Sequence, residues 1–475
     1  MPVDQVYRTA RTISFIARQD SRTKHRKHAI LSHLKSFHPR RVLKSSFRRS
    51  LRPDLDAKRN WKHMKLLVFA HVPPPHHGQS YMVQVMVNGF GGDRRKKRGS
   101  SPESNPFGID CYHVNAQFSE TLENIGEIQG MKLLRLLRFC LEAVWCRFRY
   151  GVVNFYYVPA PGKRAALYRD WLVMLLCRPF FKNVILHWHA AGLAEWLETA
   201  PRLRALTCRL FKPVNLSIVL SRFNYADAAE VSSRRICIVD NGIPDPCPDF
   251  AQSVLPRRKA RLAARVKLLK GERLNSSEAA GAGGDPQIVR VLFLAHCMKE
   301  KGLFDVLEGM VLANARWKEA DWPLRLQLTV AGEFVRQQEQ EEFHRRVSQV
   351  GSEKAARVDY LGFVKGEAKR GAFAASDCFC FPTYYPAESF GLVVVEAMAF
   401  GLPVVATRWR SLPDLLPLDY PGLVDPKSPR QIADALQRLA GMDLAESLRE
   451  TFLRRFTLER HLANLAEAIH SVERS

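Results

Sequence analysis

The most specific pattern of this chain lies in the stretch Phe381-Pro-Thr-Tyr-Tyr-Pro-Ala-Glu-Ser-Phe-Gly-Leu-Val-Val-Val-Glu-Ala-Met-Ala-Phe-Gly-Leu-Pro-Val-Val-Ala-Thr407. It predicts a strand, a loop that ends at Glu388, a short Ser-Phe-Gly turn, a helix over 392–400 and a second strand. Two strands joined by a helix in this way are typical of a parallel sheet.

Two features of this stretch favour an anionic ligand. The backbone N–H groups of Gly391, Leu392 and Val393 would be unpaired at the helix start, and with the helix dipole they form an anion site suited to a diphosphate. Two carboxylates bracket this site. Glu388 lies before the helix, where it can reach a sugar, and Glu396 lies one turn into the helix, where it can accept hydrogen bonds from ribose hydroxyls.

Short apolar runs separated by helix-length segments recur through the rest of the chain. In the first half these runs are Lys65–Ala70, Val152–Val158, Asn183–His187, Asn215–Leu220 and Ile236–Asp240. In the second half they are Val289–Ala295, Arg325–Ala331, Val358–Leu361, Cys378–Phe381 and Pro403–Thr407. This alternation predicts two doubly wound parallel sheets of the Rossmann type, with a ligand cleft between them where the carboxyl ends of the strands face.

The 475 residues divide into five expected segments. Residues 1–60 are expected to be a basic, disordered extension, and 61–245 to form the first α/β domain. Residues 246–286, rich in Pro, Lys and Arg and then in Gly, read as a linker or loop. Residues 287–455 are expected to form the second α/β domain, and 456–475 a C-terminal helix that packs back on the first.

The charge of the chain is concentrated in a few segments. Lys and Arg number 72 against 47 Asp and Glu, a formal net charge of +25. Residues 1–60 hold 16 basic and 4 acidic residues, the run 93–98 adds +4 and the stretch 256–274 adds +7. The basicity therefore belongs to tails and loops. Because these segments also lack interleaved aromatic residues, binding of nucleic acid is not favoured.

The spacing of the cysteines and the hydropathy of the chain indicate the cellular compartment in which we expect the protein. The ten cysteines are scattered without a CxxC pair or a zinc-site spacing, which is typical of reduced thiols in a cytoplasmic protein. No secretory signal follows Met1, and no apolar run approaches the ~20 residues of a spanning helix. We therefore expect a cytoplasmic protein that does not cross a membrane.

The stretch from Phe381 to Thr407 resembles the signature of the retaining glycosyltransferases of group 1, or family four, which include glycogen synthase and sucrose synthase. That signature is a glutamate, seven residues and a second glutamate, and Glu388 and Glu396 have this spacing. Phe390-Gly391, Glu396-Ala-Met-Ala399 and Pro403-Val-Val405 match its remaining positions. The resemblance implies the GT-B fold, with two facing Rossmann-like domains and an interdomain cleft.

Further landmarks of this family follow in the expected order. His296-Cys-Met-Lys-Glu-Lys-Gly302 stands where the family has Gly-Arg-x-x-x-x-Lys-Gly, so Lys301 resembles the lysine that neutralises the donor diphosphate. His296 takes the place of the usual arginine, so the phosphate clamp would rely more heavily on Lys301. Gly362 and Phe363 occupy the position of a loop that contacts the nucleobase. Ser389 completes the donor-binding set with Phe390, Gly391, Leu392 and Val393.

In the first half the resemblance implies an acceptor-side domain over 61–245. Val184-Ile-Leu-His-Trp-His-Ala-Ala-Gly192 resembles the strand end that carries a cleft-facing histidine. His189 is chosen for that role, with His187 as the alternative. Gly78 lies in a loop that resembles the family's first-strand loop, although Gln79 replaces a second glycine.

The resemblance also implies a mechanism. Negative charge grows on the leaving diphosphate, where Lys301 and the helix N–H groups would stabilise it. The acceptor attacks the sugar from the same face that the diphosphate leaves, so the anomeric configuration is retained. The departing phosphate takes the acceptor proton. Glu388 would hold the donor sugar and stabilise positive charge, and His189 would position the sugar or the acceptor. Neither a metal nor a cofactor is expected, and the nucleotide-diphosphate-sugar is a co-substrate.

Three classes of function are compatible with two α/β halves or with the basic charge. The favoured one is transfer of a sugar to a saccharide or lipid-linked saccharide acceptor, in polysaccharide or glycoconjugate biosynthesis. A sugar-nucleotide epimerase or an α-glucan phosphorylase is the alternative, but neither would share the spacing of Glu388 and Glu396. A basic nucleic-acid-binding protein is less favoured still.

An anionic membrane surface is a further expected partner. Met131 to Tyr150 is predicted to be a helix, with Lys132, Arg135 and Arg138 on one face and Leu, Phe and Trp over most of the rest. The alternative is a purely structural helix that packs on the first sheet, with arginines whose charged ends reach the solvent. The helix and the basic tail together favour peripheral association with the cytoplasmic face of a membrane.

Overall fold

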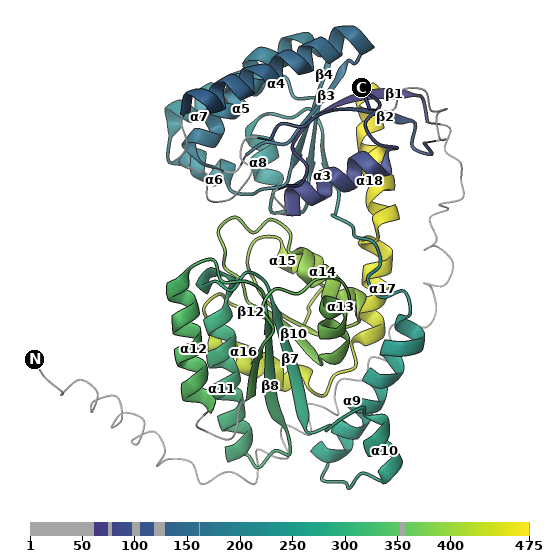
Figure 1. Ribbon diagram of the computed structural model, residues 1–475, viewed down its shortest axis with the longest axis vertical. Helices are drawn as coiled ribbons and strands as arrows, with labels where there is room; N and C mark the ends of the chain where they lie inside the picture. Colours follow the sequence, from purple (N-terminus) through teal and green to yellow (C-terminus); the bar gives the residue numbers. More distant parts are fainter. Residues whose placement is uncertain are drawn as a thin grey trace, which may run out of the picture. The chain divides into compact units, whose positions relative to one another are not determined.

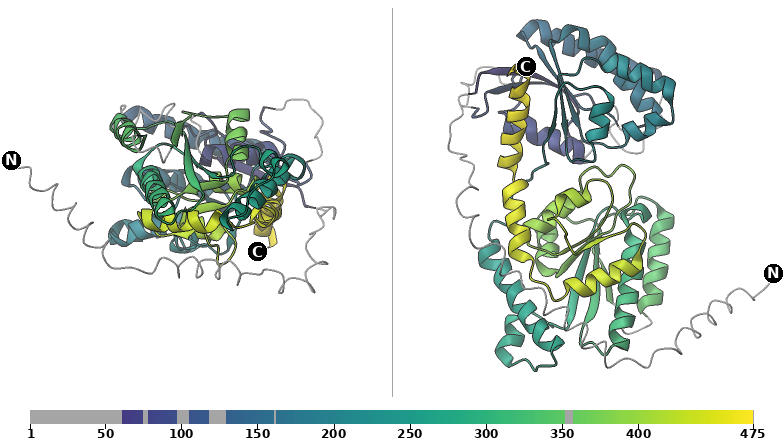
Figure 2. Two further views of the ribbon diagram at one scale, coloured as in Figure 1. Left: turned by 90° about the horizontal axis from the view of Figure 1, so that it is seen from below. Right: turned by 180° about the vertical axis from the view of Figure 1, so that it is seen from behind.

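The computed structural model describes residues 61–74, 78–96, 105–117, 129–160, 162–351 and 357–474. Within these residues lie two parallel six-stranded sheets, each with helices on both faces (Figures 1 and 2). The prediction of two doubly wound α/β halves is confirmed. The expectation for 1–60 lies outside the described residues.

The first sheet has the strand order β2-β1-β3-β4-β5-β6, with every pairing parallel. Its strands are β1 (Met64–Phe69), β2 (Ile109–Val114), β3 (Asn154–Tyr157), β4 (Asn183–Trp188), β5 (Leu216–Val219) and β6 (Ile236–Ile238). Every residue of the central strands β3, β4 and β5 is buried. Burial on both faces explains why these strands appear in the sequence as short, mainly apolar runs.

Two groups of helices cover the two faces of this sheet (Figure 1). One face packs against α3 (Gly78–Gly89) and α18 (Leu458–His470). The other face packs mainly against α4 (Gln129–Tyr150), α5 (Arg164–Cys177), α6 (Leu193–Glu198), α7 (Pro201–Phe211) and α8 (Tyr225–Glu230). The short η3 (Arg178–Phe180) follows α5. Strand β1 supplies both cores, because successive side chains of a strand point to opposite faces: Leu66 faces α3 and Leu67 faces α4.

Strand β2 was not expected from the sequence. Its residues Ile109-Asp-Cys-Tyr-His-Val114 are all buried, yet they include two polar side chains that break the apolar run. Asp110 pairs with Arg94 at 2.7 Å, and the Nε2 of His113 lies 2.8 Å from the carbonyl oxygen of Ala70. Because these polar groups have partners, they can be buried in a strand whose sequence pattern does not announce it.

The second sheet has the order β12-β11-β10-β7-β8-β9 and is also parallel throughout. Its strands are β7 (Ile288–Leu294), β8 (Arg325–Ala331), β9 (Arg357–Tyr360), β10 (Cys378–Phe381), β11 (Val404–Thr407) and β12 (Leu423–Val424). Five of these coincide with expected strands. β12 has two residues, too few to produce a pattern.

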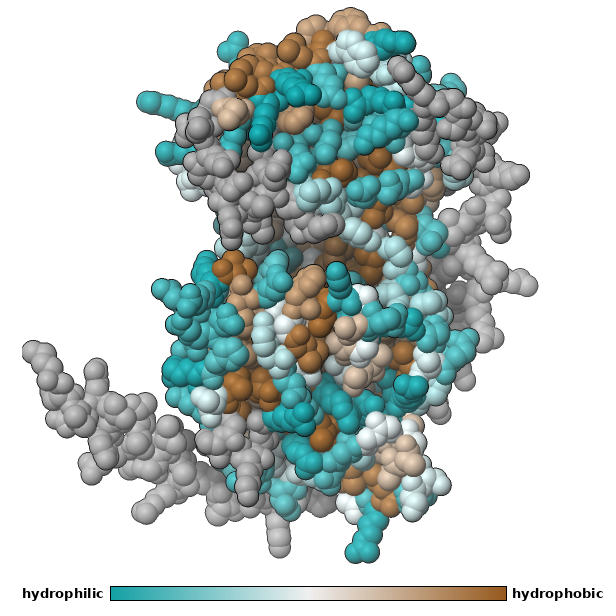
Figure 3. Space-filling view, viewed as in Figure 1, coloured by the Kyte–Doolittle hydropathy of each residue, from teal (hydrophilic) through white to brown (hydrophobic). Residues whose placement is uncertain are grey.

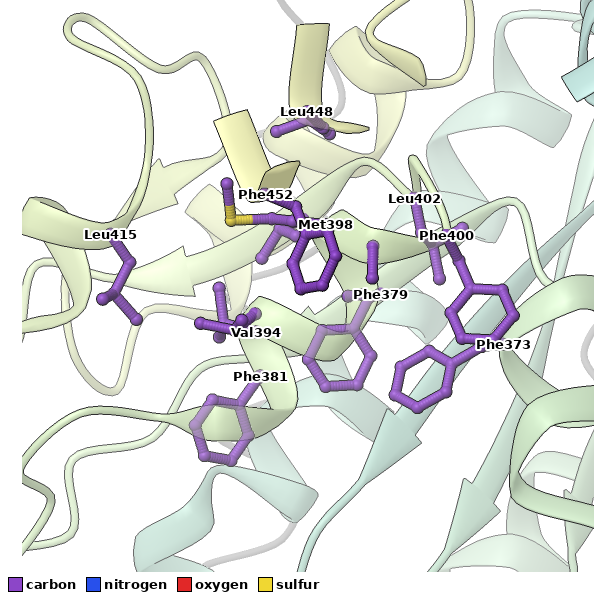
Figure 4. Close-up of a cluster of buried hydrophobic side chains, with 14 of the residues drawn as sticks. Phe373, Phe379, Phe381, Val394, Met398, Phe400, Leu402, Leu415, Leu448 and Phe452 are labelled. Carbon is purple, nitrogen blue, oxygen red and sulfur yellow. The ribbon is translucent and has the colours of Figure 1, made fainter. Parts of the chain in front are cut away.

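Helices cover both faces of the second sheet as well. One face packs against α11 (Leu303–Glu319), α12 (Gln337–Gly351) and α16 (Pro429–Leu439). The other packs against α13 (Gly366–Ala375), α14 (Leu392–Ala399), α15 (Leu412–Leu415) and α17 (Ala445–Arg455). Figure 4 shows the core on this second face, where the rings of Phe373 and Phe400 stack at 5.3 Å. This core fixes α14, whose N-terminus was predicted to bind a diphosphate.

The prediction of a linker or loop over 246–286 is wrong. The segment contains a π-helical turn η4 (Phe250–Val254), α9 (Leu255–Leu269) and α10 (Ser276–Gly281). The basic composition suggested exposed chain, but Arg261 and Arg265 of α9 are buried against the second sheet. They pair with the buried Asp377 at 2.7 and 3.1 Å. The arginines thus take the inward positions that apolar residues occupy in an ordinary amphipathic helix.

The C-terminal helix α18 completes the core of the first sheet. Leu462, Leu465 and Ile469 pack in the same apolar cluster as strand β1. Two glycines permit this close approach: a Cβ at Gly89 would lie 2.5 Å from Leu462 Cδ1, and a Cβ at Gly242 would lie 2.3 Å from the carbonyl oxygen of Thr457. The short η6 (Ser471–Arg474) follows α18.

Candidate active site

A cavity of about 570 Å³ opens at the carboxyl ends of both sheets. Loops that follow β4, β7, β8, β9 and β10 contribute to its lining. Eleven of the thirteen predicted site residues line it: Gly78, His189, His296, Lys301, Phe363, Glu388, Ser389, Phe390, Gly391, Leu392 and Val393. Such a position at strand ends is typical of ligand sites in parallel α/β sheets.

Lys301 and Glu388 form an ion pair within the cavity. The Nζ of Lys301 donates to the Oε2 of Glu388 at 2.6 Å, and the two side chains are only 15% and 10% exposed. The ammonium group also lies 4.7 Å from the ring centroid of Tyr385. Lys301 ends the short 3₁₀ segment η5 (Lys299–Lys301), which precedes α11. A bound anion would compete with the Glu388 carboxylate for this ammonium group.

The N-terminus of α14 opens into the cavity beside this pair. Gly391 precedes the helix with a φ of +81°, and among the described residues no side chain caps the N-terminal N–H groups. A Cβ at Gly391 would lie 2.7 Å from Leu412 Cδ2, so the turn requires glycine on both conformational and steric grounds. Leu392 and Val393 line the cavity, where their N–H groups and the helix dipole favour negative charge.

Glu396 differs from expectation in its surroundings. It does not line the cavity, and its Oε1 accepts a hydrogen bond at 2.6 Å from Lys369, which does. Within the described part of the chain, its buried Oε2 has no hydrogen-bond partner. Burial raises the pKa of Glu396 above its ordinary value, and the positive charge of Lys369 opposes that rise. The Glu396 carboxylate thus lies next to the cavity, held by a lysine that lines it.

The structure distinguishes the two histidines at the end of strand β4, His187 within the strand and His189 directly after it. His187 is buried, and its Nδ1 is hydrogen-bonded to the hydroxyl of Tyr156. Burial, and then the neighbouring His189 and His461, lower the pKa of His187 well below its ordinary value, which is consistent with a neutral core side chain. His189 lies against it, with ring centroids 4.0 Å apart, and lines the cavity.

His296 lines the cavity, and Gly362 does not. Desolvation and the nearby Lys301 charge lower the pKa of the His296 imidazole, so it is neutral near pH 7 and lacks the charge of the arginine that it replaces. Gly362 is absent from the lining, but its carbonyl oxygen accepts a hydrogen bond from the Gly332 N–H at 2.8 Å. Its neighbour Phe363 lines the cavity and is 64% exposed.

Several lining residues were missed by the sequence analysis as site residues. They are Gln79, Asn241, Gly332, Glu333, Lys365, Gly366 and Lys369. Of these, Gly332 could have been identified from the sequence, because it is a glycine that directly follows a predicted strand. It has a φ of +144°, and a Cβ there would lie 1.7 Å from the carbonyl oxygen of Ala295. Lys365 directly precedes α13 and Lys369 lies on it, and since neither belongs to a motif, only the fold shows their place.

No cluster of three or more His, Cys, Asp or Glu side chains suited to a metal ion occurs in the described part of the chain. The expectation of a site without metal or cofactor stays a prediction.

Comparison with protein families gives a match in the second half. Residues 289–441 match the profile of the family described as glycosyl transferases group 1. This range contains both glutamates of the signature, Lys301 and the whole of the second sheet except the first residue of β7.

Curated relatives align over parts of their length. A D-inositol 3-phosphate glycosyltransferase of Corynebacterium urealyticum is 28% identical over 276 residues, covering 54% of this chain and 62% of that protein. A phosphatidyl-myo-inositol mannosyltransferase of Propionibacterium freudenreichii is 29% identical, covering 37% of this chain and 46% of that protein. The sulfoquinovosyl transferase SQD2 of Arabidopsis thaliana is 43% identical, covering 13% and 12%. The chain thus spans less than two thirds of these relatives.

Solved structures match nearly the whole chain in fold. HepE of Anabaena in complex with UDP superposes with a TM-score of 0.56 at 16% identity, covering 86% of this chain and all of that one. Sucrose-phosphate synthase of Thermosynechococcus elongatus gives a TM-score of 0.54 at 18% identity, covering 85% and 98%. The chain therefore has the GT-B fold, and residues 289–441 within it match the group 1 glycosyl transferases.

Proposed function

We propose that this chain is a retaining glycosyltransferase that moves a sugar from a nucleotide-diphosphate-sugar to a saccharide or lipid-linked saccharide acceptor. The observation that carries the proposal is the convergence of Lys301, Glu388 and the open N-terminus of α14 on one cavity. A cation and helix N–H groups suit the leaving diphosphate, and a carboxylate beside them suits the positive charge that develops on the sugar.

In this mechanism each group acts on a different part of the donor. When the donor binds, Lys301 leaves its ion pair with Glu388 and pairs with the diphosphate, and its charge then stabilises the leaving group. Glu388, released from the ion pair, holds hydroxyls of the transferred sugar, while Glu396, next to the cavity-lining Lys369, accepts from the ribose. The departing phosphate oxygen takes the acceptor proton on the same face, so that no protein nucleophile is needed. His189 positions the sugar or the acceptor from the first half.

We propose a chemical class for the donor and for the acceptor. The solved HepE complexes contain UDP and UDP-glucose, which makes UDP the first nucleotide to test. Two of the relatives are named for inositol phosphate and phosphatidylinositol acceptors, which supports a polar or lipid-linked acceptor in glycoconjugate or polysaccharide synthesis. All ten cysteines are free, which favours the reducing cytoplasm. An epimerase or a phosphorylase is less well supported, because the family match is to glycosyltransferases.

A screen of nucleotides by thermal shift tests the proposal. A nucleotide-sugar at about one hundred times its Kd is expected to stabilise the protein by about 2.7 kcal/mol. Stabilisation by one nucleotide series, followed by transfer of its sugar, would support the proposal. Binding of a nucleotide-sugar without transfer to any saccharide or lipid-linked acceptor, or no binding by any nucleotide-sugar, would contradict it.

With that donor, the two glutamates are expected to differ. Glu388→Gln keeps the size of the side chain but removes its charge, and should lower kcat about 10²-fold with little change in KM. Glu396→Ala removes a ribose contact, and should raise the donor KM about tenfold with little change in kcat. Glu319→Ala, at the exposed end of α11, is the control. Rates within twofold of wild type for both variants would refute the assignment.

Chelation tests the proposed independence from metal. Lys301 and the N–H groups of α14 already face the position proposed for the diphosphate, so the initial rate of transfer should be unchanged by excess EDTA. The measurement compares the chelated enzyme with the same enzyme after Mg²⁺ or Mn²⁺ is restored. A complete loss of activity that either ion reverses would show that the diphosphate is held by a metal instead.

A further inference from the structure

Helix α4 carries two apolar faces. The inward face packs on the first sheet through Leu136, Cys140, Ala143 and Cys146. The outward face presents Leu134, Leu141, Trp145 and Phe148, with exposed fractions of 67%, 71%, 53% and 68%. Spacings of seven, four and three residues place these four side chains on one stripe along the helix. An ordinary surface helix has one apolar face, so the second stripe is not explained by packing within the fold.

The stripe continues onto neighbouring elements. Leu175 of α5 is 58% exposed and Phe180 of η3 is 43% exposed. The ring of Phe180 meets the edge of Phe148 with centroids 6.0 Å apart, and Arg147 of α4 donates to the Phe180 carbonyl oxygen at 2.8 Å. Hydrophobic side chains gather over these helices in Figure 3. We call these six residues, Leu134, Leu141, Trp145, Phe148, Leu175 and Phe180, the α4 apolar surface.

A contiguous set of this kind indicates an interaction surface. Single exposed apolar side chains are normal on soluble proteins, but grouped large ones mark a site that binds another apolar surface. The set lies on the helices of the first sheet and includes none of the cavity-lining residues. The proposed transfer reaction therefore does not explain it.

Charge identifies the partner. Helix α4 contains five basic residues and a single acidic one, Glu142, which is already bonded to Arg95. On the helix, Arg135, Arg138 and Arg149 lie along one flank of the apolar stripe, and all three are exposed. An apolar stripe bordered by guanidinium groups matches the boundary between acyl chains and anionic headgroups.

We propose that the α4 apolar surface docks peripherally on an anionic lipid bilayer. The apolar stripe enters the interfacial region, and the flanking arginines reach the headgroups. A second copy of the chain would fit less well, since its arginines would oppose their own equivalents. The tail 1–60, with a net charge of +12, has the same sign and is disfavoured for the same reason. Among the described helices none has the length and apolarity to cross a bilayer.

The test is flotation of the full-length protein with vesicles. We expect binding to phosphatidylcholine vesicles that contain phosphatidylglycerol at low ionic strength, weakening at high ionic strength and absent with phosphatidylcholine alone. The double variant Leu141→Ser with Trp145→Ser should lower the partition coefficient at least about tenfold. Arg135→Glu with Arg138→Glu should do the same, since each basic residue contributes about a fivefold change.

Matched controls lie in the second half. Leu418→Ser changes a side chain that is 93% exposed, and Arg438→Glu reverses a charge on α16; both should leave binding unchanged. Failure of the wild type to float with anionic vesicles would overturn the proposal. So would flotation that the α4 variants leave intact, which would place binding elsewhere in the chain. A solution dimer that Leu141→Ser with Trp145→Ser converts to a monomer would assign the surface to self-association instead.

Discussion

Replacing Lys301 with methionine is expected to lower kcat/KM for the donor nucleotide-sugar by about 10²–10³-fold, the range found for loss of one preorganised charge-stabilising donor. Lys301 is the cavity cation closest to Glu388, at 2.6 Å, and it lies beside the uncapped N-terminus of α14. The imidazole of His296, which also lines the cavity, is neutral near pH 7 and therefore adds no positive charge for the diphosphate. Methionine keeps the length of the side chain, so the loss reports the charge.

The matched control is Lys299→Met. Lys299 lies in the same 3₁₀ segment two residues earlier, but it is exposed and does not line the cavity. Its replacement should leave kcat/KM within about twofold of wild type, as expected for a surface change. Steady-state kinetics and titration of UDP binding together separate the two effects. If Lys301→Met binds UDP and turns over as well as Lys299→Met, the diphosphate lies elsewhere.

Asp377→Asn is expected to lower the free energy of unfolding by about 3–5 kcal/mol, the usual cost of breaking a buried charge pair. The carboxylate is 7% exposed and lies 2.7 Å from Arg261 and 3.1 Å from Arg265. It also accepts the backbone N–H of Arg290 at 2.9 Å. Asparagine preserves the shape but leaves two buried guanidinium groups without a counter-charge. The shift of the urea midpoint measures the effect.

Asp434→Asn is the control, since Asp434 pairs with Arg316 at 2.5 Å on the surface, where such a pair contributes at most about 1 kcal/mol. Burial alone would raise the pKa of Asp377, but Arg265 and Arg261 outweigh it and hold the pKa below its ordinary value. Its contribution to stability is therefore full above the unfolded-state pKa of about 3.9 and is lost as the pH falls towards the folded value. The difference in the free energy of unfolding between Asp377→Asn and wild type should therefore become smaller at acidic pH. An equal deficit for both variants at pH 7 would contradict the account.

The sequence predicts the architecture well where burial is uniform. Central strands such as β4 and β10 are buried on both faces, so they appear as short, mainly apolar runs between turns. Where polar side chains are buried with partners, the pattern is lost. Asp110 and His113 hide strand β2, and Arg261 and Arg265 give α9 the composition of a linker. In both cases tertiary pairing outweighs composition.

The candidate site shows the same division. Residues on one continuous motif, from Glu388 to Val393, come together in the cavity because a single turn and helix position them. Lys369 could not be found in this way, because its partner Glu396 lies 27 positions further along the chain and only the fold brings the two charges to 2.6 Å. The choice between His187 and His189 likewise needed the Tyr156 hydroxyl, which comes from a different strand.

Helix α18 has a consequence for how this protein is made. Its residues Leu462, Leu465 and Ile469 belong to the core of the first sheet, although more than two hundred residues separate them from strand β6. During synthesis the first domain emerges from the ribosome long before this helix exists, so the face that α18 will cover stays open while the second domain folds. A fragment cut after Gly242 would expose that face permanently. The first domain is thus completed by residues that are translated only after the strands of the second sheet.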